Sequence, residues 1–238
     1  MNKTREEAVK TSAEIEKNMP ETDVEVVLAP PFVYLEAVRN VITNIKLAAQ
    51  NCFWSDFGAY TGEVSAKQLT DYCSYIIVGH SERIKYQNEQ NEDIAKKIKA
   101  VLKSGLTPIL CVGEDLSQRE AEQTENIIRT KVVECLSKIK DNEVKNVIIA
   151  YEPIWSISTT ENRKDCTKED AKEAAFLIKK IISEKFDVFD IKVFFGGNVN
   201  PENAVNYLHE EEFAGVLVGG ASLDAEKFIK IIEKAEKC

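Results

Sequence analysis

The chain has 238 residues, 44% of them hydrophobic and 30% charged, with a formal net charge of −9 and a pI near 5.0. The acidic balance argues against a nucleic-acid or anionic-membrane partner, and no apolar run reaches membrane-spanning length. The composition supports a sizeable core, and no Ser-, Gly- or Pro-rich stretch indicates a linker, so we expect one domain over residues 1–238.

The N-terminal residues are polar and do not resemble a signal peptide, and the six cysteines show no Cys-x-x-Cys spacing. We therefore expect a cytoplasmic protein with reduced thiols that act as packing residues. The two histidines, His80 and His209, have no partner at ligand spacing, so the sequence predicts no metal site. His209 lies in a polar His-Glu-Glu-Glu run, which is typical of a solvated surface residue.

Short β-branched runs alternate with longer amphipathic runs. The first amphipathic run, residues 5–17, precedes every strand-like run. The predicted strands then follow at residues 24–29, 45–49, 75–78, 107–112, 147–151, 192–195 and 215–218, and the later predicted helices at 32–41, 91–104, 118–139, 168–185, 201–208 and 225–235. This alternation predicts parallel strands joined by right-handed crossovers. A leading helix fits an eight-fold (β/α) barrel that lacks its first strand, but also an open doubly wound sheet, and the pattern alone does not decide.

Glu152 ends the buried strand-like run at residues 146–151 and is followed by Pro153, which cannot donate to a sheet. Carboxyl ends of buried parallel strands are where α/β proteins place catalytic groups. The alternative is a strand-end glutamate that faces solvent.

Seven motifs occur in order, most of them at predicted strand ends. They are Asn2-Lys3-Thr4 with Glu7-Ala8, Ala59-Tyr60-Thr61-Gly62-Glu63, Val78-Gly79-His80-Ser81-Glu82-Arg83, Pro108-Ile109-Leu110-Cys111-Val112-Gly113-Glu114, Ala150-Tyr151-Glu152-Pro153-Ile154-Trp155, Gly196-Gly197 leading into Asn200-Pro201-Glu202-Asn203-Ala204, and Leu217-Val218-Gly219-Gly220-Ala221-Ser222-Leu223. On these residues the chain closely resembles the triosephosphate isomerase family, nearly end to end. The resemblance implies a TIM (β/α)8 barrel, here without its first strand, and cofactor-free interconversion of dihydroxyacetone phosphate and glyceraldehyde 3-phosphate.

Aldose–ketose isomerisation through an enediolate needs a base for a carbon acid and an electrophile for the carbonyl oxygen. The resemblance implies that Glu152 is the base and that His80, at the start of a helix, is a neutral electrophile. A neutral histidine at a helix N-terminus is an established property of this family. Glu82 is a third candidate, as a proton relay or an orienting group near His80, and an ion pair with a neighbour such as Arg83 is equally open.

The resemblance also implies a phosphate site and a homodimer. Phosphate would be held by backbone N–H groups at Gly219 and Gly220, by Asn198, and by the lid at Ser158. Thr61, in the loop at residues 51–63, would lie near the partner's active site.

Three departures from the family stand out. The family's lid glycines and lysine are replaced in Trp155-Ser156-Ile157-Ser158-Thr159-Thr160-Glu161, and its Tyr-Gly-Gly-Ser becomes Phe195-Gly196-Gly197-Asn198. The family's Asn-x-Lys strand would precede Met1, and loss of one such charged group costs about 10²–10³ in rate. We expect the natural protein to carry roughly five to ten further residues, enough for one strand. The competing hypotheses are a catalytically idle paralogue that binds a phosphate ligand or another protein, and an isomerase of another small sugar phosphate, such as a four-carbon ketose phosphate.

Overall fold

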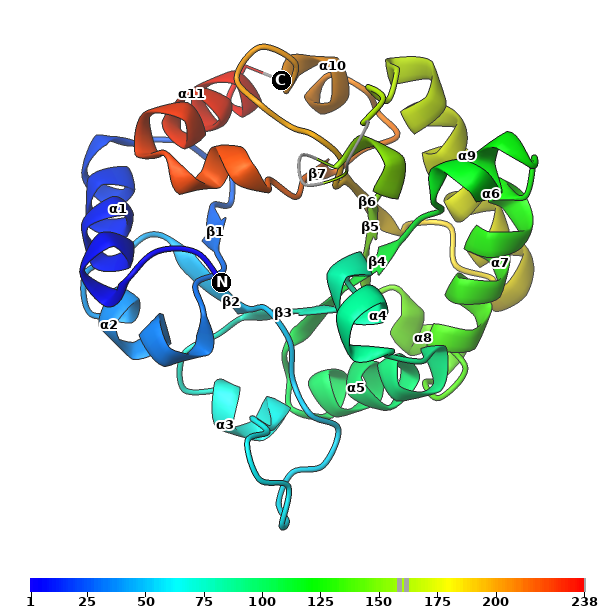
Figure 1. Ribbon diagram of the computed structural model, residues 1–238, viewed down its shortest axis with the longest axis horizontal. Coiled ribbons are helices and arrows are strands. Elements are labelled where there is room, and N and C mark those ends of the chain that lie inside the picture. The colour runs from blue at the N-terminus through cyan, green and yellow to red at the C-terminus, as the bar shows by residue number, and fades with distance from the viewer. Residues whose placement is uncertain (158–159, 161–162, 238) are drawn as a thin grey trace.

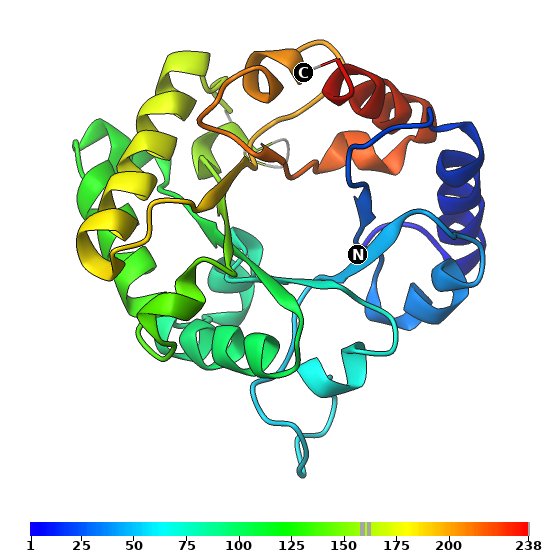
Figure 2. The same ribbon diagram turned by 180° about the vertical axis from the view of Figure 1, so that it is seen from behind.

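The computed structural model describes residues 1–157, 160 and 163–237. Its seven strands form one parallel sheet in the order β1 to β7. The strands are β1 (Val27–Leu28), β2 (Lys46–Ala49), β3 (Tyr75–Val78), β4 (Thr107–Val112), β5 (Ile148–Tyr151), β6 (Lys192–Phe195) and β7 (Gly215–Val216). Figures 1 and 2 show these strands curling around a centre, with the helices on the outside. This is the architecture of a TIM barrel in which β1 and β7 end the sheet, so the barrel prediction is confirmed.

The helices alternate with the strands along the chain. They are α1 (Arg5–Asn18), α2 (Leu35–Arg39), α3 (Ala66–Leu69), α4 (Ser81–Gln87), α5 (Asn91–Lys103), α6 (Leu116–Glu120), α7 (Thr124–Cys135), α8 (Asp141–Val144), α9 (Lys168–Phe186), α10 (Val205–Leu208) and α11 (Ala225–Ala235), with short 3₁₀ turns η1 (Phe32–Tyr34), η2 (Ile154–Ser156) and η3 (Gly220–Leu223). Among these described elements, no helix is long and apolar enough to cross a membrane.

Side-chain alternation along the strands separates two cores. On β4 and β5, Ile109, Cys111, Ile148 and Ala150 join Ile77 in a cluster built from strand residues alone. The intervening residues of the same strands pack in the larger cluster shared with the helices. This is the expected result of the two-residue period of a strand, which sends successive side chains to opposite faces. Cys111 is fully buried in the strand cluster, as its interpretation as a packing residue requires.

Several predicted elements differ from the observed ones in length. The predicted helix at residues 118–139 is two helices, α6 and α7, because Glu122 between them adopts a left-handed φ of 56°. Such a conformation cannot continue a right-handed helix. The outer strands are shorter than predicted, since β1 and β7 each contain two residues.

Candidate active site

Glu152 follows β5, whose four residues are all buried. Its backbone N–H donates to the carbonyl of Val112 at 2.7 Å, which holds it against the end of β4. The residue is only 2% exposed, so its carboxylate lies inside the molecule. The alternative of a strand-end glutamate that faces solvent is therefore wrong.

His80 lies directly against this carboxylate, although the two residues are distant in sequence. Gly79, with a φ of 69°, turns the chain at the end of β3, and His80 is the residue that caps α4. The distance from His80 Nε2 to Glu152 Oε1 is 2.8 Å. Ser81 adds two donors, because its backbone N–H reaches Oε2 at 3.1 Å and its hydroxyl reaches Oε1 at 3.0 Å. The strand ends thus bring the predicted base and electrophile together.

The contacts of the His80 ring define one tautomer. The backbone N–H of Glu82 donates to Nδ1 at 3.3 Å, so Nδ1 acts as an acceptor. A neutral ring with its hydrogen on Nε2 satisfies this bond and also donates to Glu152. Burial lowers the pKa of His80, but the hydrogen bond and charge of Glu152, followed by the charge of Glu82, outweigh it and raise the pKa overall. The N-terminus of α4 acts in the opposite direction and favours the uncharged ring.

Glu82 points its carboxylate toward the same ring. Its Oε2 lies 3.9 Å from His80 Nδ1, and its side chain is 58% exposed. Arg83 pairs with Glu89 instead, at 3.1 Å, so the structure does not bear out the ion pair between Glu82 and Arg83. Glu82 therefore stands at the solvent side of His80, opposite Glu152.

Glu114 is a buried residue that sequence reasoning treated only as the end of a motif. Its carboxylate is 0% exposed and accepts hydrogen bonds from the Tyr151 hydroxyl at 3.0 Å, from Trp155 Nε1 at 3.1 Å and from Arg119 Nη1 at 3.3 Å. Arg119 also lies over the Trp155 ring, 4.8 Å from its centroid. Glu114 thereby anchors the segment that follows Glu152, where the predicted lid begins. The sequence signal for Glu114 is its position two residues after the buried strand β4, just beyond Gly113.

The far end of the same segment has a second anchor. The Tyr207 hydroxyl donates to the carbonyl of Cys166 at 3.1 Å, and the Cys166 N–H donates to the Ser156 hydroxyl at 3.1 Å. The Tyr207 ring stacks on Phe195 at a centroid distance of 3.7 Å. A tyrosine hydroxyl from α10 therefore holds the stretch that follows the predicted lid, although Phe195 has no hydroxyl. Ser158 lies outside the described residues.

The candidate phosphate residues follow the last two strands. Asn198 comes after β6, and Gly219 and Gly220 come after β7, where both glycines are exposed. The Leu217 N–H donates to the Phe195 carbonyl at 2.8 Å, which joins the two strand ends. Because all strands are parallel, these residues lie at the same end of the sheet as His80 and Glu152.

Thr61 lies in the loop at residues 51–63, which projects away from the ring of helices (Figure 1). The base of the loop is closed by the Phe53 N–H, which donates to the Val64 carbonyl at 2.7 Å. Toward its tip the loop exposes Phe57 and Tyr60, at 74% and 47%. Thr61 is exposed as well, so the loop presents a surface that its own chain does not cover.

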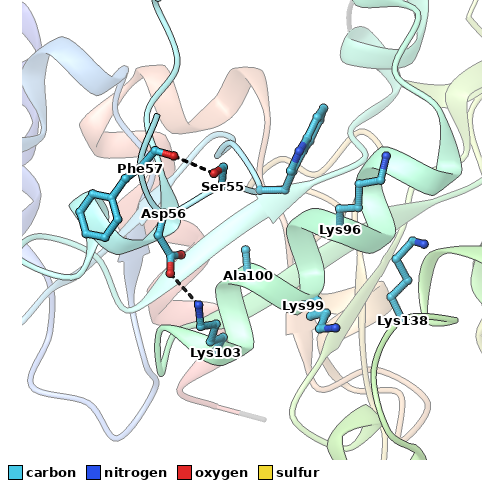
Figure 3. Close-up of a pocket in the computed structure, with 9 residues that line it drawn as sticks. Ser55, Asp56, Phe57, Lys96, Lys99, Ala100, Lys103 and Lys138 are labelled. Atoms are coloured by element: carbon cyan, nitrogen blue, oxygen red, sulfur yellow. Dashed lines mark hydrogen bonds and ion pairs between the residues drawn. The ribbon is translucent and has the colours of Figure 1, made fainter. Parts of the chain in front are cut away.

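A separate surface hollow of about 510 Å³ lies between the base of this loop and α5. Figure 3 shows Lys96, Lys99 and Lys103 around it, with Lys103 paired to Asp56 at 2.6 Å. Of the candidate site residues that the structure describes, none lines this hollow. In the part of the chain that the structure describes, no group of three His, Cys, Asp or Glu side chains is placed to hold a metal ion. The strand ends therefore remain the candidate site.

Comparison with known proteins agrees with this geometry. A family model described as triosephosphate isomerase matches residues 1–235. Curated relatives with that name include those of Alkaliphilus metalliredigens, 44% identical over 238 residues, Alkaliphilus oremlandii, 41% identical over 238, and Dictyoglomus thermophilum, 44% identical over 234. The first two alignments cover 98% of this chain and 95% of the relative, and the third covers 96% and 92%. The chain belongs to the triosephosphate isomerase family.

Proposed function

We propose that this protein interconverts dihydroxyacetone phosphate and D-glyceraldehyde 3-phosphate through an enediolate, with Glu152 as the base and His80 as the electrophile. The observation that carries the proposal is the 2.8 Å contact between a buried carboxylate and the Nε2 of a histidine whose other nitrogen accepts a backbone hydrogen bond. The names of the relatives support the proposed triose phosphate substrate, since the aligned curated proteins are called triosephosphate isomerase.

The proton moves between adjacent carbons. Glu152 removes a proton from the carbon next to the carbonyl, and the electron pair of the C–H bond forms the C=C bond of the enediolate. The carbonyl π electrons move to the oxygen, to which His80 Nε2–H donates a hydrogen bond. The proton of the adjacent hydroxyl passes to the former carbonyl oxygen by way of His80 Nε2, and the hydroxyl oxygen becomes the new carbonyl as Glu152 returns a proton to the neighbouring carbon. These transfers complete the isomerisation without a cofactor.

Substrate entry changes the surroundings of both groups. The carbonyl oxygen takes the place of Glu152 at His80 Nε2, and the carboxylate turns from Ser81 toward the substrate carbon. His80 then loses the contact with Glu152 that raises its pKa, while the N-terminus of α4 still favours the neutral ring. Glu82, at 3.9 Å from Nδ1, serves as an orienting group on the opposite side of the ring.

The phosphate is held at the ends of β6 and β7. Backbone N–H groups at Gly219 and Gly220 and the amide of Asn198 bind it, together with the lid at Ser158. Backbone N–H groups can bind a phosphate without the positive charge of a lysine, so a protein with a net negative charge can still bind this anion. The exposed position of both glycines leaves their N–H groups accessible to a ligand.

The working protein is a cytoplasmic homodimer of single-domain subunits. The projecting loop supports the dimer, because its exposed Phe57 and Tyr60 form an apolar surface of the kind that a partner subunit covers. Thr61, beside Tyr60, then lies near the partner's active site.

Turnover of D-glyceraldehyde 3-phosphate in D₂O tests the chemistry. We expect saturable formation of dihydroxyacetone phosphate, with deuterium on the carbon that is protonated. Glu152→Gln should reduce kcat by about 10²–10⁴-fold, whereas His209→Gln, which alters the exposed second histidine, should leave kcat unchanged. Both residues 1–238 and the same chain with a preceding strand that carries Asn-x-Lys are assayed. Absence of turnover in both folded forms refutes the isomerase.

A further inference from the structure

Lys131 is a buried cation beside the proposed active site. It lies on α7, where it faces inward with Ile128, Val132 and Cys135, and it is only 7% exposed. Its Nζ donates to the carbonyl oxygen of Gly79 at 3.0 Å. A buried charge is costly unless contacts compensate for it. The burial of the Lys131 ammonium group therefore needs a compensating contact from outside α7.

The carbonyl that Lys131 holds belongs to the peptide bond between Gly79 and His80. Gly79 occupies the left-handed region, with a φ of 69°, and a Cβ there would meet Ile94 at 3.0 Å. This turn leads the chain from β3 to the residue that caps α4. The Lys131 hydrogen bond thus fixes the peptide unit from which the His80 side chain extends.

The charged groups around His80 come from three elements. Glu152 follows β5 and Glu82 belongs to α4, and both negative charges raise the pKa of His80. Lys131, from α7, lowers it. Lys131 also lies close enough to two buried thiols, Cys111 and Cys135, to lower their pKa values, but burial outweighs this effect and keeps both thiols protonated. Lys131 is thus the positive charge that opposes the two carboxylates at the ring.

The other buried charges nearby form a separate group. Glu89 pairs with Arg83 at 3.1 Å and also with Lys97, and Lys97 donates to Asn51 at 2.8 Å. Lys131 makes its hydrogen bond to the catalytic turn instead. Lys131 therefore contacts the turn before His80. Lys97 instead joins α5 to the loop that projects from the barrel.

We propose that Lys131 is a positioning residue for the acid–base pair: its ammonium group fixes the Gly79 carbonyl, and its positive charge opposes protonation of the His80 ring. This role rests on the proposed function of His80 as an electrophile. A neutral ring can donate from Nε2 while Nδ1 accepts from Glu82, and a protonated ring would lose that acceptor. Lys131 acts through His80 and contacts no substrate.

The test follows the protonation of His80 by NMR in protein labelled with ¹⁵N-histidine. Only His80 and His209 contribute signals, and the exposed His209 provides an internal reference. Lys131→Gln retains an N–H donor for Gly79 but removes the charge. We expect the His80 titration midpoint to rise by about half a pH unit or more, with no change at His209. Arg129→Gln, which removes a partly exposed charge from the same helix, should leave both midpoints unchanged.

Kinetics supply a second measurement. In Lys131→Gln the acid limb of the kcat/KM profile should move to higher pH by the same amount as the His80 midpoint. Lys131→Met, which lacks both the donor and the charge, should also lower kcat at every pH. An unchanged His80 midpoint in folded Lys131→Gln overturns the charge role. If the midpoint shifts but no variant turns over substrate, the inference about Lys131 stands and the isomerase proposal fails.

Discussion

Gly113→Ala is expected to damage the active site through backbone contact alone. A Cβ added at Gly113 would lie 1.8 Å from the carbonyl oxygen of Glu152 and 2.6 Å from its carbonyl carbon. The distance between the added Cβ and the Glu152 carbonyl oxygen must lengthen from 1.8 Å to at least 3.0 Å, an increase of 1.2 Å. The Glu152 carbonyl atoms cannot rotate away, because they belong to the backbone. Overpacking of this kind costs about 1–3 kcal/mol of unfolding free energy.

The displaced residue is the proposed base. Its carboxylate is 2.8 Å from His80 Nε2, so a shift of this size breaks the contact. Misplacement of a catalytic group by ~1 Å lowers the rate about 10²-fold. We expect kcat for glyceraldehyde 3-phosphate to fall by that factor, with the secondary structure retained in circular dichroism.

Gly105→Ala is the matched control. Gly105 has a φ of 75°, but a Cβ there would meet no atom within 4 Å. The variant should lose about 1–2 kcal/mol of stability from backbone strain and keep its kcat. A Gly113→Ala protein that remains stable, with kcat within about threefold of the parent, would refute the reasoning, since a misplaced base cannot be that active.

Three further predictions concern the second anchor, the histidine and the loop. Tyr207→Phe removes the hydroxyl that bonds to Cys166 but keeps the ring stack, so urea unfolding should show a loss of about 1 kcal/mol; an unchanged midpoint would mean that the bond is not maintained in solution. Burial lowers the pKa of His80, yet Glu152 and Glu82 raise it overall. The stability that His80 contributes is therefore complete below its unfolded pKa and is lost as pH rises through the folded value. Urea unfolding should show this loss above about pH 6.5, and His80→Gln should weaken it; an equal slope in the variant would contradict the sign. Thr61→Arg places a charge in the proposed interface, and light scattering should then report a monomer where the parent is a dimer; a parent that is already monomeric would remove the basis for the interface.

The inner strands could be predicted because their sequences satisfy several requirements at once. Residues 75–78, 107–112 and 192–195 are rich in β-branched or aromatic residues, and the structure has strands with the same bounds. The outer strands are shorter than predicted, because each pairs on one side only within the described sheet. Residues 118–139 looked like one helix, since the break at Glu122 involves no proline or glycine.

At the candidate site, the sequence predicted which residues would meet but not how they are held. Strand-end position was enough to bring His80 and Glu152 together. The donors from Ser81 and the contact of Tyr207 with Cys166 depend on side-chain directions that no linear spacing encodes. Lys131 was missed for a related reason, because a lysine in an amphipathic helix is usually assigned to the exposed face.

Glu114 and Tyr207 hold the two ends of the stretch from Trp155 to Cys166, and both residues lie outside that stretch. Between them, Lys164 adds contacts of its own, since its N–H donates to the Trp155 carbonyl at 3.1 Å and its ammonium group pairs with Glu120 at 2.8 Å. The two outside anchors make Trp155 and Cys166 suitable junctions for an experiment that exchanges the sequence between them. The departures from the family at residues 156–161 lie between these junctions, so such an exchange would change the predicted lid and leave both anchors in place.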